Sequence, residues 1–409
     1  MTVGGQKRMK TNPSCCSDSG HSVTRLRPQR SFTVALAIGL PALMGQRLRG
    51  EDQVDYRFHN YQEEAGRIRV QTHSTYFELT PTPSVTLSGA AVYDAISGAS
   101  PTGAPPRKGS KQVPIAKLED EREAGNLSAG IRWRSNQTTT PQIAYSVEQD
   151  YESIGASLVH AIELNQKNTT LSFGGSYTYD EISPLFWNGD KEYKNSADFM
   201  VGLSQLLGPK TILAANITYG TSHGYMTDPY KRFRFSDYPL ESVTFPEQRP
   251  NFREKQIGFL SLTHFFTPLN GSAELTYRVY HDSYEIVSHT VGLNWYQKVG
   301  RHVLVSPMFR FTDQSAADFY AVQLRGDPTV SPDDPFAPHF PIPKYYSADY
   351  RLSALQTFTY GVTVSVTIKQ HVTLDLGYSR YEMFGKDHRT SASAYPKANI
   401  FTAGLRVLF

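Results

Sequence analysis

Apolar and polar side chains alternate along most of the chain with a period of two. Between Tyr346 and Ile368 the even positions are mostly apolar or aromatic, whereas the odd positions are mostly Ser, Thr, Asp, Arg and Gly. Because successive side chains of a strand point to opposite faces, this segment is predicted to be one long strand with one apolar and one polar face. The same alternation returns in segments that begin near Leu127, Ile154, Leu171, Ala197, Leu213, Ala273, Val287, Val303 and Val372.

The composition of the polar face indicates what surrounds these strands. A soluble β-sandwich needs bulky side chains on its inward faces, because two sheets must fill one core. Here the face opposite the apolar one consists of Ser, Thr, Gly, Asp, Asn and Arg. The apolar face is therefore predicted to meet lipid and the polar face to line a lumen. A closed barrel also satisfies every backbone polar group inside hydrocarbon. We expect an all-β fold, a transmembrane antiparallel up-and-down β-barrel.

The spacing of the segments predicts about 16 strands, starting with one at Asp55 to Glu63. The alternative is 14, if Gln142 to Leu164 is one strand and not a hairpin turning at Asp150 and Tyr151. Short turns are expected on the periplasmic side and long loops on the extracellular side. The long loops are expected at roughly 95–124, 181–192, 221–252, 313–344 and 384–396. Pro307 lacks a backbone N–H, so we expect a bulge there or a strand end near the rim.

Both ends of the chain carry features of exported proteins. Arg25, Arg27 and Arg30 precede an apolar run, Phe32 to Met44, which is too short to span a bilayer. This order predicts a signal peptide and leader at 1–45, followed by a barrel domain at 46–409; a buried helix is the alternative interpretation. No plug-sized domain precedes the first expected strand, so an energised siderophore-type receptor is not expected. The last strand has one apolar face, formed by Phe401, Leu405, Val407 and the terminal Phe409.

Charge and cysteine content narrow the function classes. Residues 1–45 hold six of the 41 Lys and Arg residues and one of the 38 Asp and Glu residues. Their removal leaves 35 basic and 37 acidic residues, so a nucleic-acid partner is not expected. Cys15 and Cys16, the two cysteines, lie in the leader, which excludes cysteine chemistry from the barrel.

Four ordered motifs resemble a known family. They are YQEEAGRIRV at Tyr61 to Val70, VYDAISGASPTG at Val92 to Gly103, SVEQDYES at Ser146 to Ser153 and NQKNTTL at Asn165 to Leu171. Together they resemble the bacterial outer-membrane barrel family catalogued as domain of unknown function 3570. The resemblance implies an outer-membrane barrel, without an established activity or catalytic residue. Genes of this family often lie near those of flavin-transferase-like and lipoprotein partners, which hints at an envelope redox system. The terminal aromatic likewise resembles the assembly signal read by the barrel-insertion machinery.

The expected lumen face carries charges of both signs. Such an interior can line a water-filled pore, or it can pair across the lumen and seal the barrel. Glu274 and Arg278 lie four residues apart on one strand face, roughly 13 Å, so they are not expected to pair with each other. The lumen-facing candidates are Arg132, Arg134, Asp198, Asn216, Glu274, Arg278, Asn294, Asp349, Arg351, Asp375 and Arg406.

Two functions remain open, with an enzyme as a distant third. The first is a passive or gated conduit for small solutes or ions. The second is a closed barrel that acts as an envelope scaffold or docks a lipoprotein or redox partner. A hydrolase would need Ser and His in hydrogen-bond reach, but His73, His160, His264 and His289 are scattered. We therefore expect neither catalysis nor a cofactor. Candidate loop contacts are Asp94, Ser97, Ser100, Glu148 and Asp150; Asp94, Glu148 and Asp150 are carboxylates that could converge on a cation.

Overall fold

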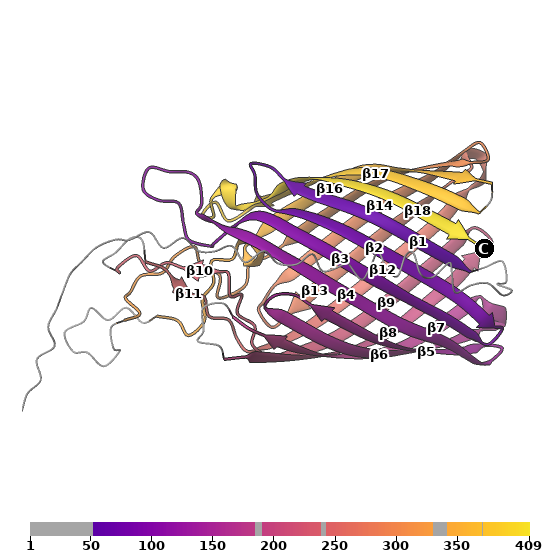
Figure 1. Ribbon diagram of the computed structural model, residues 1–409, viewed down its shortest axis with the longest axis horizontal. Coiled ribbons are helices and arrows are strands. Elements are labelled where there is room, and N and C mark those ends of the chain that lie inside the picture. Colours follow the sequence, from indigo (N-terminus) through magenta and orange to yellow (C-terminus); the bar gives the residue numbers. More distant parts are fainter. Residues whose placement is uncertain (1–51, 185–189, 239–242, 330–341, 370) are drawn as a thin grey trace, which may run out of the picture.

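The protein forms a closed antiparallel β-barrel. The computed structural model describes residues 52–184, 190–238, 243–329, 342–369 and 371–409, so the expected signal peptide lies outside the described residues. Sixteen strands close the barrel, because β1 pairs with both β2 and β18, and two further short strands form a separate sheet (Figure 1). Both the all-β fold class and the predicted strand number are confirmed.

The strands follow the sequence around the barrel, except that β10 and β11 lie in a loop between β9 and β12. The barrel strands are β1 (Gln53–Glu63), β2 (Arg69–Thr82), β3 (Val85–Pro101), β4 (Ile115–Arg134), β5 (Gln137–Val147), β6 (Tyr151–Leu164), β7 (Thr169–Ile182), β8 (Glu192–Gly208), β9 (Thr211–Gly224), β12 (Phe252–Phe266), β13 (Gly271–Asp282), β14 (Val287–Val299), β15 (Val303–Gln314), β16 (Leu355–Ile368), β17 (Val372–Gly385) and β18 (Lys397–Leu408). The short sheet pairs β10 (Arg232–Phe233) with β11 (Phe245–Pro246).

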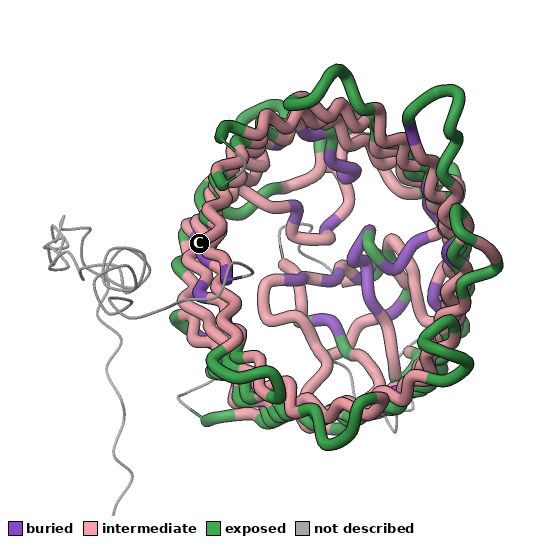
Figure 2. Tube along the Cα trace, turned by 90° about the vertical axis from the view of Figure 1, so that its right-hand side faces the viewer, coloured by how far each residue is buried: buried purple, intermediate pink, exposed green. Residues whose placement is uncertain are grey.

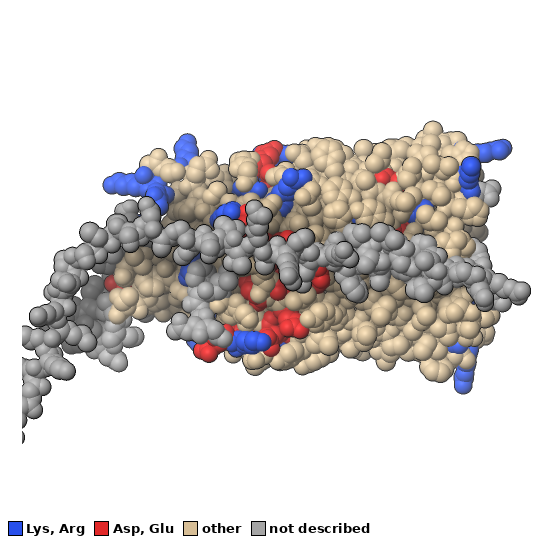
Figure 3. Space-filling model, in the orientation of Figure 1, with Lys and Arg blue, Asp and Glu red and all other residues tan. Residues whose placement is uncertain are grey.

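Large apolar side chains cover the outside of the barrel. Ile217 and Leu376 are 71% and 67% exposed, and Leu127, Ile154 and Phe401 are also exposed. Side chains between such positions on each strand point into the barrel, because strand side chains alternate. Figure 3 shows the result on one face, where uncharged surface predominates and charged side chains gather mainly toward the left end. The predicted apolar outer face is confirmed.

The two ends of the barrel differ in their connections. At the end that holds the C-terminus, here called the turn end, every connection is short, as predicted. At the opposite loop end, long connections occupy 102–114, 225–251, 315–354 and 386–396. The predicted loop 95–124 is too long, because β3 and β4 continue to pair up to Pro101 and Ile115. Three connections at the loop end are also short, namely 64–68, 148–150 and 283–286.

The long strand predicted from Tyr346 begins later than expected. β16 starts at Leu355, and a short 3-10 helix occupies Tyr350–Leu352. The apolar alternation continues through Ala348, Tyr350 and Leu352. These side chains are buried against other loops and do not face lipid. Asp349 and Arg351 are therefore loop residues, and their prediction as strand positions is wrong.

Pro307 lies inside β15 without a bulge. It keeps its register with Val362 of β16. On the side of β14, the ladder lacks the two pairs between Asn294–Met308 and Gln297–Val305, and the register on either side of the gap is unchanged. Proline has no backbone N–H, so Pro307 interrupts the ladder hydrogen bonds only on the side of β14. The predicted bulge or displaced strand end is wrong.

In the part of the chain that the structure describes, helical structure is confined to single turns. The 3-10 helices are Asn165–Lys167, Thr267–Leu269, Tyr350–Leu352 and Ala392–Ala394. Within the described ranges, no helix has the length and apolar character needed to cross a membrane.

Candidate functional site in the barrel lumen

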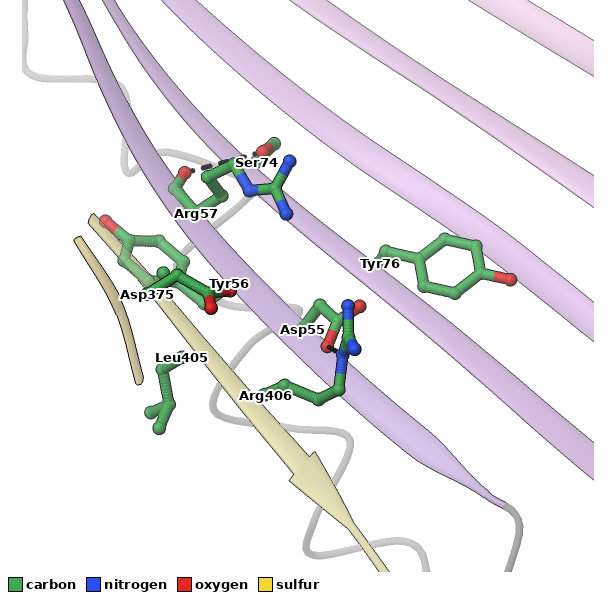
Figure 4. A pocket seen from close by; sticks show the side chains of 9 residues that line it. Asp55, Tyr56, Arg57, Ser74, Tyr76, Asp375, Leu405 and Arg406 are labelled. Atoms are coloured by element: carbon green, nitrogen blue, oxygen red, sulfur yellow. Dashed lines mark hydrogen bonds and ion pairs between the residues drawn. The ribbon is translucent and has the colours of Figure 1, made fainter. Parts of the chain in front are cut away.

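Charged side chains on the lumen wall meet across neighbouring strands. Arg406 of β18 donates from Nε to Asp55 Oδ1 of β1 at 2.8 Å. Arg57 of β1 and Asp375 of β17 are the register partners of Gly404 of β18. Figure 4 shows the Arg57, Asp375 and Arg406 side chains around the same hollow. This cavity has a volume of about 250 Å³. A Cβ on Gly404 would come within 3.3 Å of the Asp375 side chain, so the glycine keeps this part of the wall open. The predicted candidates Asp375 and Arg406 therefore lie together.

Glu274 is held by uncharged donors. Its Oε2 accepts from Asn294 Nδ2 and from the Tyr296 hydroxyl, both at 3.1 Å, and its Oε1 accepts from Ser261 Oγ at 3.3 Å. Two of the predicted lumen residues, Glu274 and Asn294, are thus direct partners. As predicted, no ion pair joins Glu274 to Arg278 in the described residues.

The remaining strand candidates also occupy positions that alternate with exposed apolar residues. Asp198 of β8 lies 3.5 Å from Lys255 Nζ of β12. Asn216 of β9 lies beside Gly202, where an added Cβ would be 3.7 Å from the Asn216 Cβ. Arg132 and Arg134 are exposed near the turn end, on either side of a register shift between β4 and β5.

Long loops cross the loop end of the barrel and contact one another. The described parts of residues 225–251 and 315–354 meet in two isolated β-bridges, Phe235–Leu324 and Gln248–Tyr346. Arg232 N also donates to Thr102 O, which ties in the loop 102–114. Figure 2, seen from the turn end, shows buried loop segments that cross inside the ring of strands. We call the described parts of loops 102–114, 225–251, 315–354 and 386–396 the lid.

The lid has small hydrophobic cores of its own. Phe233 and Phe235 are 0% and 2% exposed and pack with Ala348 and Tyr346. Tyr350 packs with Tyr395 in a second cluster, which joins the loops 315–354 and 386–396. Burial of this aromatic surface stabilises the closed arrangement of the loops.

A buried ion-pair network connects the two longest lid loops. Asp349, 1% exposed, accepts from Arg249 Nη2 at 2.8 Å and from Arg351 Nε at 2.9 Å. Arg351 also pairs with Asp228, and Arg249 pairs with Glu247 at 2.6 Å. Burial alone would raise the pKa of Asp349, but the nearby guanidinium groups hold that pKa well below its usual range. Burial raises the pKa of Glu247.

Lys231 anchors the lid to the end of β3. Its Nζ donates to Pro101 O at 2.7 Å and to Ser100 Oγ at 3.4 Å, and burial lowers its pKa. Ser100, one of the predicted loop-contact candidates, thus contacts a residue of the lid. Ser97 lies within β3, opposite Arg69 and Glu119. Gly98 has φ +119°, and a side chain there would collide with the Arg67 carbonyl.

The predicted carboxylate group forms with one different member. Glu148 and Asp150 converge with Asp120 of β4, and one oxygen atom from each residue lies within 4.8 Å of the others. Asp94 instead pairs with Arg122 and accepts from the Thr72 hydroxyl at 2.5 Å. Burial raises the pKa of Glu148, and the negative charge of the nearby Asp120 raises it further. Three carboxylates are ligands that a hard divalent cation uses, although exposed acidic groups often bind nothing.

The four histidines considered for hydrolysis have hydroxyl partners on neighbouring strands. His73 and His289 contact the hydroxyls of Tyr56 and Tyr277, both at 2.7 Å. The partners of His160 and His264 are Thr139 and Thr211, at 2.9 Å and 2.8 Å. Among these four pairs, none brings a Ser hydroxyl to a His.

A second cavity lies between the lid and the wall of β12 to β15. It has a volume of about 430 Å³. Its lining residues combine predicted candidates with residues that the sequence analysis missed: Asp228, Arg249, Arg253, Arg278, Tyr280, Ile286, Ser288, Gln314, Asp349, Arg351 and Leu352. Arg249 and Asp228 lie in a predicted loop, and nothing in the sequence except their charge marked them as site residues. Arg253 could be placed at the cavity only from the register of β12 in the structure. We call this space the arginine cavity.

A family model matches nearly the whole described chain, at residues 34–190 and 186–397. Its description is "Protein of unknown function (DUF3570)". The chain belongs to this family. The predicted resemblance is therefore confirmed, and this family member is an outer-membrane-type β-barrel. A comparison with curated proteins gives no match.

Solved outer-membrane proteins have similar folds. CdiB from Acinetobacter baumannii is 9% identical, with a TM-score of 0.50 over 88% of this chain and 61% of that chain. The siderophore receptor PirA from Pseudomonas aeruginosa is 10% identical, with a TM-score of 0.44 over 88% and 62% of the two chains. A bacterial polysaccharide outer membrane secretin is 8% identical, with a TM-score of 0.47 over 89% and 100%. This family member thus spans about three fifths of the length of PirA, and at such identities the likeness concerns the fold alone.

Proposed function

We propose that this protein is a gated conduit for small solutes or ions in the outer membrane of a Gram-negative bacterium. The observation that carries the proposal is the contrast between the lumen wall and the lid. The wall is polar and bears charges beside cavities, as at Asp55, Arg57 and Asp375, whereas a lid joined by ion pairs covers the loop end. A polar lumen closed by a separable cover is what a gate requires.

In this proposal the turn end faces the periplasm and the lid faces the outside. The protein reaches the membrane after export by the segment 1–45 and insertion by the barrel machinery. Phe401 and Leu405, members of the proposed assembly signal, are exposed on the outer face of β18, and Phe409 N bonds to Asp52 O. Outer-membrane lipid surrounds the exposed apolar face.

The hydrophobic clusters of the lid favour a second candidate function. Phe233, Phe235 and Tyr350 are buried among loop residues, which stabilises the closed arrangement. A permanently closed barrel would act as an envelope scaffold, with its outer loops or turn end docking a lipoprotein or redox partner. Catalysis by this chain is not part of either proposal.

Planar-bilayer recording tests the conduit directly. We expect the wild type to conduct rarely and the Asp349→Asn variant, which loses the charge between Arg249 and Arg351, to conduct often. Asp318→Asn is the matched control, since Asp318 lies exposed in the same loop. Silence of both the wild type and Asp349→Asn, with both proteins folded by heat-modifiability gels, would refute the conduit and favour the scaffold.

A further inference from the structure

The arginine cavity contains one arginine whose charge has no partner. Arg253 pairs with Asp282, Arg249 with Glu247 and Asp349, and Arg351 with Asp349 and Asp228. Arg278 has no carboxylate within ion-pair distance among the described residues, and its guanidinium lies 5.5 Å from the centre of the Tyr280 ring. Three of the four arginines that line the cavity are therefore paired, and Arg278 is the fourth.

The strand neighbours of Arg278 bring no acid to it, and the two carboxylates that line the cavity, Asp228 and Asp349, are paired with Arg249 and Arg351. Its cross-strand neighbours are Phe259 on β12 and Thr290 on β14, both uncharged. Ser288 on β14 and Gln314 on β15 also line the cavity. A guanidinium presents a planar fork that matches the two oxygens of a carboxylate or phosphate. The neighbours of Arg278 therefore leave this fork free for a ligand.

The shape of the cavity limits the ligand to a small molecule. A volume of about 430 Å³ lies toward the low end of typical small-molecule pockets. Ile286 and Leu352, 2% and 5% exposed, contribute an apolar side beside the arginines. The lid supplies Asp228, Asp349 and Arg351, and the barrel wall supplies Arg253 and Arg278. A ligand here would contact both the lid and the wall.

From this geometry we propose that the arginine cavity binds a small oxyanion, either a carboxylate or a phosphate, through Arg278. The proposal rests on the conduit function and names the class of solute that the conduit admits. Because the site joins the lid and the wall, the bound oxyanion lies between them at the loop end of the barrel.

Titration calorimetry of the detergent-folded protein tests the site without measuring conductance. The probes are succinate and inorganic phosphate, with chloride as an anion that cannot occupy both arms of the fork. We expect succinate or phosphate to bind. The probe that binds more tightly shows whether the site takes a carboxylate or a phosphate. Arg278→Gln should weaken this binding by about tenfold or more, because a charge-assisted bidentate contact is lost.

Two further variants make the test specific. Arg278→Lys keeps the charge without the fork and should retain weak binding. Such residual binding would show that the loss in Arg278→Gln does not come from misfolding. Arg310→Gln is the matched control, because Arg310 faces the lumen from β15, beside the exposed Phe309, but does not line the cavity. Absent binding of both oxyanions, equal displacement by chloride, or equal weakening in Arg310→Gln would overturn the proposal. Conductance without oxyanion binding would leave the conduit standing and refute only the site, whereas binding without conductance would refute only the conduit.

Discussion

Asp198 and Lys255 form an ion pair across a strand that lies between them. Asp198 is on β8, Lys255 is on β12, and both are register partners of Gly220 on β9. The Lys255 Nζ lies 3.5 Å from Asp198 Oδ1. Strands two apart are separated by about 9.5 Å, so the side chains must cross above the middle strand. A Cβ on Gly220 would collide with the Asp198 carboxylate, so the glycine makes the crossing possible.

The Gly220→Ala variant should therefore break this ion pair while the barrel still folds. The carboxylate is the movable end of a side chain, and the pair is partly solvated, so we expect a loss of at most about 1 kcal/mol in the free energy of unfolding. The measurement is a double-mutant cycle with Asp198→Asn in urea. The effect of Gly220→Ala should largely vanish in the Asp198→Asn background.

Gly202→Ala provides the matched control for that cycle. Gly202 lies on β8, and a Cβ there would meet only ordinary contacts, the nearest at 3.7 Å. Its effect should be additive with that of Asp198→Asn. An additive effect of Gly220→Ala would contradict the crossing geometry.

The Asp349→Asn variant should loosen the lid. Removing this buried charge leaves Arg249 and Arg351 without their shared partner, which typically costs about 3 kcal/mol or more. Hydrogen-exchange mass spectrometry should detect faster exchange in the described parts of loops 225–251 and 315–354. Exchange in the wall strand β17 should stay at its wild-type rate. Unchanged exchange in both loops would show that the hydrophobic clusters alone hold the lid.

The same carboxylate predicts how the lid responds to acid. The folded-state pKa of Asp349 is lowered, so its contribution to stability is present above its unfolded pKa of about 3.9 and is lost as the pH falls through the lower folded value. Glu247 acts with the opposite sign, because burial raises its pKa and the folded state then binds its proton more tightly. We expect loop exchange, corrected for its intrinsic pH dependence, to be similar at about pH 8 and pH 5 and to rise only below about pH 4. Lid opening between pH 7 and about pH 5 would point to a group other than Asp349.

The barrel itself could be predicted because lipid imposes one rule on every strand. Side chains that face the hydrocarbon must be apolar, so Leu376 faces outward while Asp375 faces the lumen. The two faces followed from that alternation, and the strand number followed from the count of segments together with the even strand number of such barrels.

The lid could not be predicted in the same way. Arg249 and Asp349 are 100 residues apart, and neither segment has a period that points to the other. The alternation around Tyr350 even gave a wrong strand start, because a loop buried among loops also alternates. Glu148 and Asp150 were predicted to converge, but their partner Asp120 required the register of β3, β4 and β5.

Arginine at neighbouring positions of β16 should separate the lipid face from the lumen face. Val364 pairs laterally with Val305 and Leu376 on the outer face, whereas Ser365 pairs with Leu304 and Asp375. Val364→Arg places a charge in hydrocarbon, which costs roughly 2 to 4 kcal/mol at mid-membrane. Ser365→Arg places the same charge in the lumen, where Asp375 can pair with it. We therefore expect Val364→Arg to reduce the heat-modifiable, membrane-inserted fraction strongly and Ser365→Arg to reduce it little. Equal losses in the two variants would mean that the faces of β16 are assigned incorrectly.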